Sequence, residues 1–143
     1  MLAIQIDHTI QAPASVVWLY LSDLNKFAEV HPIICKVDTY GGGAYRLYEK
    51  LPLGPFSFRF SYPVRVTLDP KEKIVRYEST VLGIAKLDMR FHIVDRGDHS
   101  VTHEVVEIRS RLPVERYTAG ECRKYHSMVF ANMESEVLGK VHL

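Results

Sequence analysis

The fold of this protein is decided by the stretch at residues 114–138, VERYTAGECRKYHSMVFANMESEVL. A helix of about 25 residues is about 37 Å long, which is enough to cross a small domain. Pro113 stands at its start, where the first turn of a helix tolerates proline, and Gly139 follows at the position of a C-terminal stop. The stretch therefore predicts one long helix on which the rest of the chain is organised.

One face of this predicted helix is polar at positions where a helix with only a packing role would carry leucine or isoleucine. At about 100° per residue the inward face consists of Thr118, Cys122, Tyr125, His126, Val129, Met133 and Val137. Hydroxyl, thiol, phenol and imidazole groups suit the wall of a partly polar cavity, and we favour this interpretation. The alternative is a core helix whose polar groups are satisfied locally, because buried polar groups usually have partners.

The composition is that of an ordinary soluble globular protein. With 47% hydrophobic and 24% charged residues in a chain of 143, it argues against both disorder and membrane insertion. We expect a single domain over residues 1–143. Eighteen basic and seventeen acidic residues, without a block of one sign, predict no nucleic-acid partner. The N-terminus lacks the pattern of a signal peptide, so a cytoplasmic protein is expected.

Neither the cysteines nor the glycines form a recognisable motif. Cys35 and Cys122 lie far apart without metal-type spacing, so we interpret them as reduced thiols. The histidines and glutamates show no HxH or HExxH spacing, and we expect no metal and no cofactor. The run Gly41-Gly42-Gly43 precedes a strand rather than a helix, so it is interpreted as a turn and not as a phosphate loop.

The remaining chain predicts two short helices and a series of strands. Residues 2–11 alternate as a half-buried strand, with His8 on the apolar face, where a lone histidine is more often a core residue than a ligand. A short helix between Pro13 and Ser22 and a second at about 24–30 follow. Further strands are predicted at about 33–40, 44–51, 56–68, 73–82, 85–95 and 100–111. The loops are too short for parallel crossovers, so consecutive strands are expected to be antiparallel neighbours.

Two strands need comment on which residues face inward. The strand at 56–68 places Phe56, Phe58, Phe60 and Tyr62 on one face, as plain core or as a ring-stacking site, and Pro63 indicates an edge or a bulge. In the last strand two registers compete, one with Thr102, Val106 and Ile108 inside and one with Val101 and Val105 inside. We prefer the first, which directs Glu104 inward.

This order predicts an α+β fold in which the terminal helix covers the apolar face of a curved antiparallel sheet. The run IDHTIQAPASVVWLYLSDL at residues 6–24, followed by Phe27 and His31-Pro32, resembles the START-related, pollen-allergen-like helix-grip superfamily. Its polyketide cyclase/dehydrase and lipid-transport branch is the most similar. The resemblance implies a seven-stranded sheet wrapped around the C-terminal helix, with two short helices after the first strand.

The resemblance also implies where a ligand would lie, namely between the concave face of the sheet, the long helix and the two short helices. Carried onto this chain, that space would be faced by His8, Glu49, Phe58, Phe60, Tyr77, Ser79, Met89, Phe91, Glu104, Cys122, Tyr125, His126 and Val129. A mostly apolar enclosure with a few polar groups is the usual form of a small-molecule site.

Three functions are consistent with these observations. The first is binding of one small hydrophobic or amphipathic ligand, lipid-like or polyketide-like. The second is a cyclase or dehydratase in which Glu49, Glu104, Tyr125 and His126 are the candidate catalytic groups. The third is an interaction module with a filled cavity, docking on a protein partner through the outer sheet face or the helix ends. A cavity of about 300 Å³ or more would favour a ligand site over the third function.

Overall fold

The computed structural model describes residues 1–141 and has the predicted element order. The elements are β1 (Leu2–Ile10), α1 (Ala14–Ser22), α2 (Leu24–Val30), β2 (Ile34–Gly41), β3 (Ala44–Leu53), β4 (Phe56–Asp69), β5 (Ile74–Val81), β6 (Ala85–Asp95), β7 (Ser100–Ser110) and α3 (Glu115–Val141). The clearest difference from the predicted elements is at the end of α3. The helix was expected to stop at Gly139 but continues to Val141.

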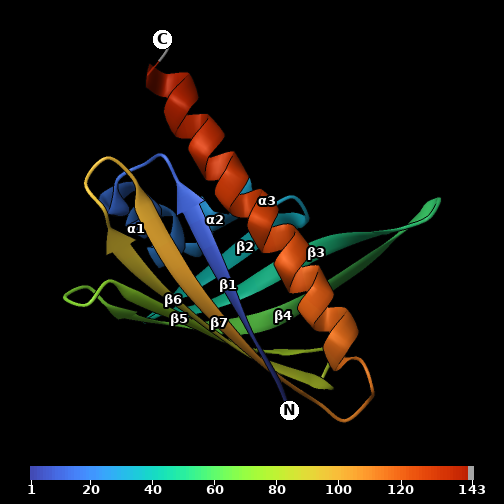
Figure 1. The fold of residues 1–143 in the computed structure, drawn as a ribbon. Helices are drawn as coiled ribbons and strands as arrows, with labels where there is room; N and C mark the ends of the chain where they lie inside the picture. The colour runs from blue at the N-terminus through green and yellow to red at the C-terminus, as the bar shows by residue number, and fades with distance from the viewer. Residues whose placement is uncertain (142–143) are drawn as a thin grey trace.

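The seven strands form one antiparallel sheet in the order β1-β7-β6-β5-β4-β3-β2. It curves around α3, which crosses its concave side (Figure 1). Consecutive strands from β2 to β7 are neighbours, as predicted. The first strand pairs with the last, with Ile6 opposite Glu104, so α1 and α2 connect the two outermost strands of the sheet. The predicted α+β helix-grip architecture is confirmed.

The preferred register of the last strand is also confirmed. Thr102, Glu104, Val106 and Ile108 are buried, whereas Val105 faces outward. In β4, Pro63 lies just before the point where pairing with β5 begins, at Val64. Residues 56–63 therefore pair only with β3, and Pro63 occupies a local edge, as its chemistry requires.

The short helices pack on the sheet through a small set of apolar side chains. Asp23 ends α1 and caps α2, because its Oδ1 accepts a hydrogen bond from the backbone N–H of Asn25 at 2.9 Å. Leu21, Leu24 and Phe27 are buried. Trp18 is only partly buried, and Lys73 lies over its ring, with Nζ 5.0 Å from the ring centre.

The two halves of α3 have different surroundings. Beyond His126, Val129, Phe130 and Met133 are buried in the main core. Polar contacts fix this half: Asn132 Nδ2 donates to the Val30 carbonyl at 2.8 Å, and the Tyr20 hydroxyl donates to Glu136 at 2.6 Å. The N-terminal half packs on β6 and β7 through Ala119 and Cys122, and the rest of its inward face borders a cavity. The inward stripe is therefore cavity wall at one end and ordinary core at the other.

We predict that Gly43→Ala destabilises the protein by at least about 2 kcal/mol. Gly43 has φ +83°, and a Cβ there would lie 2.4 Å from the carbonyl oxygen of Val66, whose N–H donates to the Gly43 carbonyl. The matched control is Gly42→Ala, because Gly42 also has a positive φ but open space around its Cβ position. Denaturant unfolding should show the larger loss for Gly43→Ala; equal losses would contradict the close approach.

Candidate functional site

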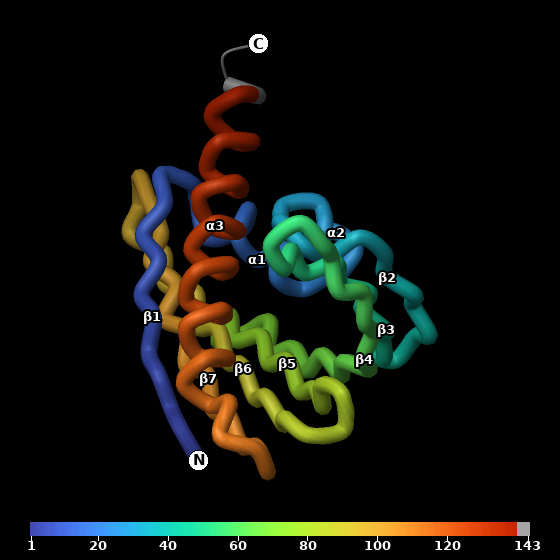
Figure 2. Tube along the Cα trace, turned by 90° about the vertical axis from the view of Figure 1, so that its right-hand side faces the viewer, coloured from blue at the N-terminus to red at the C-terminus, as the bar shows by residue number. Residues whose placement is uncertain are grey.

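A cavity of about 400 Å³ lies between the concave face of the sheet, the end of α2 and the N-terminal half of α3. Strands β3 to β6 supply most of its wall. In Figure 2, α3 stands on one side and β3, β4 and the β5–β6 turn on the other, and these elements supply cavity-lining residues. The lining is mostly apolar, and the polar groups are concentrated around His126.

Nine of the residues expected to face the site border this cavity: Glu49, Phe58, Phe60, Tyr77, Ser79, Met89, Cys122, Tyr125 and His126. His8, Phe91, Glu104 and Val129 do not, which corrects that part of the expectation. They are buried farther along the sheet, where α3 packs directly on it and leaves no space.

The structure adds lining residues that the sequence did not single out. Phe27 and His31 come from the end of α2, Tyr62 from β4, and Leu53, Leu82 and Tyr117 from the opening. Tyr62 was detectable, since it continues the alternation of Phe58 and Phe60. Leu82 and Tyr117 lie in a turn and at a helix start, where no periodicity indicates which way a side chain points.

The aromatic residues of β4 form a stacked row along the cavity wall. The ring centres of Phe58 and Phe60 are 5.4 Å apart, and those of Phe60 and Tyr62 are 6.0 Å apart, with interplanar angles of 23° and 25°. All three rings also border the cavity, so they are not plain core. Their apolar surface is available to whatever occupies the cavity.

Behind the wall, a fully buried carboxylate joins two histidines. Glu104 Oε1 lies 2.8 Å from His8 Nε2, and Glu104 Oε2 is hydrogen-bonded to His126 Nδ1. The His8 ring stacks on Phe130 at 3.8 Å. His126 uses Nδ1 for Glu104, and its Nε2 makes no hydrogen bond to residues 1–141. The arrangement fixes the orientation of an imidazole that borders the cavity.

The electrostatics of this group follow from burial and charge together. Burial by itself lowers the pKa of His126, but the charge of Glu104 and the hydrogen bond to it reverse the shift and raise that pKa above 6.5. Burial would raise the pKa of Glu104, yet the charges and hydrogen bonds of His126 and His8 outweigh it and lower that pKa below 4.5. The pair thus favours a carboxylate next to an imidazolium.

Glu49, unlike Glu104, borders the cavity itself. Burial raises the pKa of Glu49, although a hydrogen bond from the Tyr62 hydroxyl, 2.6 Å from Oε2, and the charge of His126 both oppose this shift. The neighbouring His31 is kept neutral, because burial, assisted by the charge of His126, lowers its pKa to about 3. The Nδ1 of His31 accepts the backbone N–H of Ile33 at 3.2 Å.

The remaining polar groups of the wall are less suited to chemistry. Burial, with the nearby acids, raises the pKa of the Cys122 thiol to about 12, so it is not a thiolate nucleophile. The Thr118 hydroxyl donates to the Val114 carbonyl of its own helix at 2.8 Å. Residues 1–141 contain no cluster of three or more His, Cys, Asp or Glu placed to hold a metal ion. Proton transfer through His126 and Glu49 is the chemistry that this site can support.

Solved structures resemble this chain closely in fold but not in sequence. No protein-family model matches the sequence, and a search of curated proteins returns no match either. A START superfamily protein from Mycobacterium smegmatis superimposes with a TM-score of 0.76 at 18% identity, over 94% of this chain and 98% of that one.

Two further structures extend this similarity. An aromatase/cyclase, ZhuI from Streptomyces sp. R1128, gives 0.74 at 15% identity over 98% and 95% of the two chains, and Ara h 8.0201 gives 0.76 at 12% over 96% and 99%. This chain has the START-related helix-grip fold. The resemblance found in the sequence is confirmed at the level of the fold.

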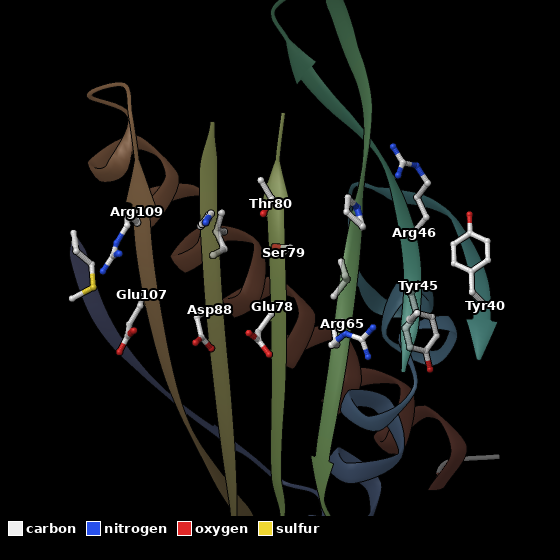
Figure 3. A pocket seen from close by; sticks show the side chains of 16 residues that line it. Tyr40, Tyr45, Arg46, Arg65, Glu78, Ser79, Thr80, Asp88, Glu107 and Arg109 are labelled. Atoms are coloured by element: carbon white, nitrogen blue, oxygen red, sulfur yellow. The ribbon is translucent and has the colours of Figure 1, made fainter. Parts of the chain in front are cut away.

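The outer face of the helix-grip sheet carries a second, open hollow of about 580 Å³ on the side away from α3 (Figure 3). Charged residues cross it in register, with Arg65 opposite Glu78, Glu78 opposite Asp88, and Asp88 opposite Glu107. Asp88 also accepts two hydrogen bonds from Arg76, at 3.0 and 2.6 Å. Exposed pairs of this kind contribute little to stability, and we assign no ligand to this face.

Among residues 1–141, no helix of the helix-grip fold is long and apolar enough to cross a membrane. The expected cytoplasmic location stays a prediction.

We predict a pH-dependent contribution of the Glu104–His126 pair, measured as the difference in unfolding free energy between the parent and Glu104→Gln. Breaking a buried pair costs about 3 kcal/mol. Because the folded pKa of His126 is raised, this stabilisation is complete below pH 6.5 and is lost as the pH rises through the raised value. Because the folded pKa of Glu104 is lowered, the same stabilisation is present above pH 4.5 and is lost as the pH falls through the lowered value.

Urea unfolding over a pH series should therefore give the largest difference between pH 4.5 and 6.5. The control is Glu107→Gln, which changes the outward glutamate of the same strand. A Glu104→Gln difference that does not vary with pH would show that the pair is not charged in the folded protein.

Proposed function

We propose that this protein binds one small hydrophobic or amphipathic molecule, lipid-like or polyketide-like, in the cavity between the sheet and α3. The observation that carries this proposal is an apolar cavity of about 400 Å³ with its polar groups gathered around His126. Ligand sites usually measure about 300–1,000 Å³ and combine apolar walls with a few oriented polar groups. An open cavity of this size argues against the interaction module with a filled interior.

The polar groups indicate how such a ligand would be oriented. His126 Nε2 has no hydrogen-bond partner within residues 1–141, and Glu49 uses only one of its two oxygens for Tyr62. Unpartnered polar atoms of a cavity wall are satisfied by water or by a ligand. We infer that the ligand places an oxygen-bearing group against His126 and Glu49 and its apolar part along Phe58 and Phe60.

The solved structures with this fold support the class of ligand only in general terms. One is named as a START superfamily protein and another as an aromatase/cyclase, but both are less than 20% identical to this chain. Fold alone does not determine function. The ligand class proposed here therefore rests on the chemistry of the cavity, and transport of a lipid is one use of such binding.

We predict that Ser79→Trp abolishes uptake of the fluorescent probe 1-anilinonaphthalene-8-sulfonate while costing less than about 1 kcal/mol, because the new ring enters empty space. Val129→Trp is the matched control. Val129 is fully buried in the core away from the cavity, so its replacement should destabilise by about 1–3 kcal/mol or more. Probe titration and denaturant melts measure both. Unchanged probe uptake by Ser79→Trp would place the binding site elsewhere.

A second candidate function, an enzyme of the cyclase or dehydratase type, is favoured by the buried His8–Glu104–His126 array. A carboxylate on Nδ1 orients the imidazole and leaves Nε2 to exchange a proton with a substrate. In a dehydration above the raised pKa of His126, where its imidazole is neutral, Nε2 would take the proton α to a carbonyl. Protonated Glu49 would give its proton to the departing hydroxyl, which leaves as water. Glu104 and His8 would be positioning residues.

For this second function we expect His126→Asn to lower the turnover of a hydrophobic β-hydroxy ketone by at least about 100-fold. Binding of the probe should persist. The matched control is His103→Asn, because His103 Nδ1 contacts Asp7 at 2.7 Å in an exposed pair outside the cavity. Product formation measured against pH should follow a bell-shaped curve in the parent. Equal turnover by the parent and His126→Asn would exclude His126 as the base.

A further inference from the structure

Six large exposed apolar side chains lie on the segments that carry the opening of the cavity: four line it, Phe56 pairs with Leu53 at the hairpin tip, and Leu112 precedes α3. We call Leu53, Phe56, Phe58, Leu82, Leu112 and Tyr117 the apolar rim. Phe56, at the tip of the β3–β4 hairpin, is 78% exposed, and Tyr117, in the first turn of α3, is 58% exposed. Such a gathering of exposed aromatic and leucine side chains is unusual on a soluble protein and marks an interaction site.

The apolar rim is continuous with the interior of the cavity. Leu53, Phe58, Leu82 and Tyr117 line the cavity as well as being exposed. The hairpin that carries three of the six residues projects beyond the body of the sheet (Figure 1). Its strand β4 has no β5 partner before Val64, so the tip stands away from the neighbouring strand. A partner that meets the rim therefore also meets the opening.

Leu82 provides an independent observation. It adopts φ +54° in the β5–β6 turn, a left-handed conformation that favours Gly, Asn or Asp. Its side chain is 53% exposed, so packing in the core does not account for a leucine there either. A large apolar side chain that suits neither its backbone nor its surroundings fits a role in contact with something outside the chain.

The exposed charges on the segments that carry the apolar rim are mainly positive, although the acid Glu121, one turn after Tyr117, also borders the cavity. The hairpin sequence from Lys50 to Ser61 contains two cations, Lys50 and Arg59, and no acid. Arg111 and Arg116 flank Leu112 and Tyr117, and all four cations are exposed. Within residues 1–141 none of the four forms an ion pair. Glu115, the acid beside Arg116, is engaged by the backbone N–H of Ser110 at 3.0 Å.

We propose that the apolar rim docks on an anionic lipid surface, with its apolar side chains inserted at the headgroup level and the four cations against acidic headgroups. Apolar insertion combined with a cluster of cations is the pair of signals that stable peripheral binding requires. A protein partner or a second copy of the chain would bury the same apolar side chains, but an excess of unpaired cations around them matches anionic lipid.

The test uses the full chain and flotation with two kinds of vesicle, phosphatidylcholine alone and phosphatidylcholine mixed with phosphatidylglycerol. The parent should bind the anionic vesicles, and binding should weaken as salt is raised. The double variant Leu53→Ser/Phe56→Ser should lower the partition coefficient by at least about tenfold. Lys50→Glu with Arg59→Glu should lower it by about fivefold per charge.

Matched controls lie at the opposite end of the sheet. Leu19→Ser removes an exposed leucine from α1, and Lys71→Glu reverses a charge in the β4–β5 turn. Both segments lie away from the hairpin tip (Figure 1), so neither change should alter vesicle binding. Controls that weaken binding as much as the rim variants would overturn the proposal.

The sharpest variant is Leu82→Asn, because its effects on folding and on docking have opposite signs. Asparagine suits a left-handed turn better than leucine, so the thermal midpoint should be unchanged or higher while vesicle binding falls. Loss of binding in this variant cannot result from misfolding. Retained binding in Leu82→Asn and in Leu53→Ser/Phe56→Ser alike would overturn the proposal.

The inference is independent of the identity of the cavity ligand and is separable from the proposed function. Uptake of 1-anilinonaphthalene-8-sulfonate by the parent without any vesicle binding overturns only the docking surface. Size-exclusion chromatography with light scattering tests whether a second copy of the chain covers the apolar rim. A dimer that Phe56→Ser converts to a monomer, together with no binding to anionic vesicles, would show that a second copy covers the apolar rim.

Discussion

A carboxylate shielded completely from solvent is the constraint on which this structure depends. Glu104 lies on β7 in the interior, and its two oxygens meet His8 from β1 and His126 from α3. Leaving such a charge without partners would cost several kcal/mol. The first strand, the last strand and the terminal helix must therefore keep their mutual positions. The interaction that holds the grip together also orients His126, the only imidazole of residues 1–141 with both a buried carboxylate partner and a place on the cavity wall.

The cavity exists because the N-terminal half of α3 packs only on the β6–β7 side of the sheet, where Ala119 and Cys122 are buried, and leaves the side toward β3 to β5 open. Beyond His126, Val129, Phe130 and Met133 fill the space between helix and sheet, and hydrogen bonds to α1 and α2 secure that half. Before it, smaller and more polar side chains such as Thr118 and Cys122 leave room above β3 to β6. The well-packed half provides the stability that permits the other half to stay open.

The local structure was predictable from the sequence because it depends on near neighbours. Alternation and turn residues predicted each strand within a few residues, and the mixture of Thr118, Cys122, Tyr125 and His126 on one helix face indicated a cavity wall. The preferred register of β7 was right, and it directed Glu104 inward. An error occurred where the local signal was weak, because Gly139 did not end α3.

The pairing of β1 with β7 and the extent of the cavity were decided by the tertiary structure alone. Hydrophobic periodicity records which face of an element is buried, but not which distant element covers it. The sequence therefore placed His8, Glu104 and Val129 correctly on the inner face but could not separate cavity wall from core. His8 of β1 and His126 of α3 are linked through a third side chain, Glu104 of β7, which is distant from His8 in the sequence. The chain by itself determined the elements and their inward faces, whereas long-range packing determined which inward groups meet each other and which meet an empty space.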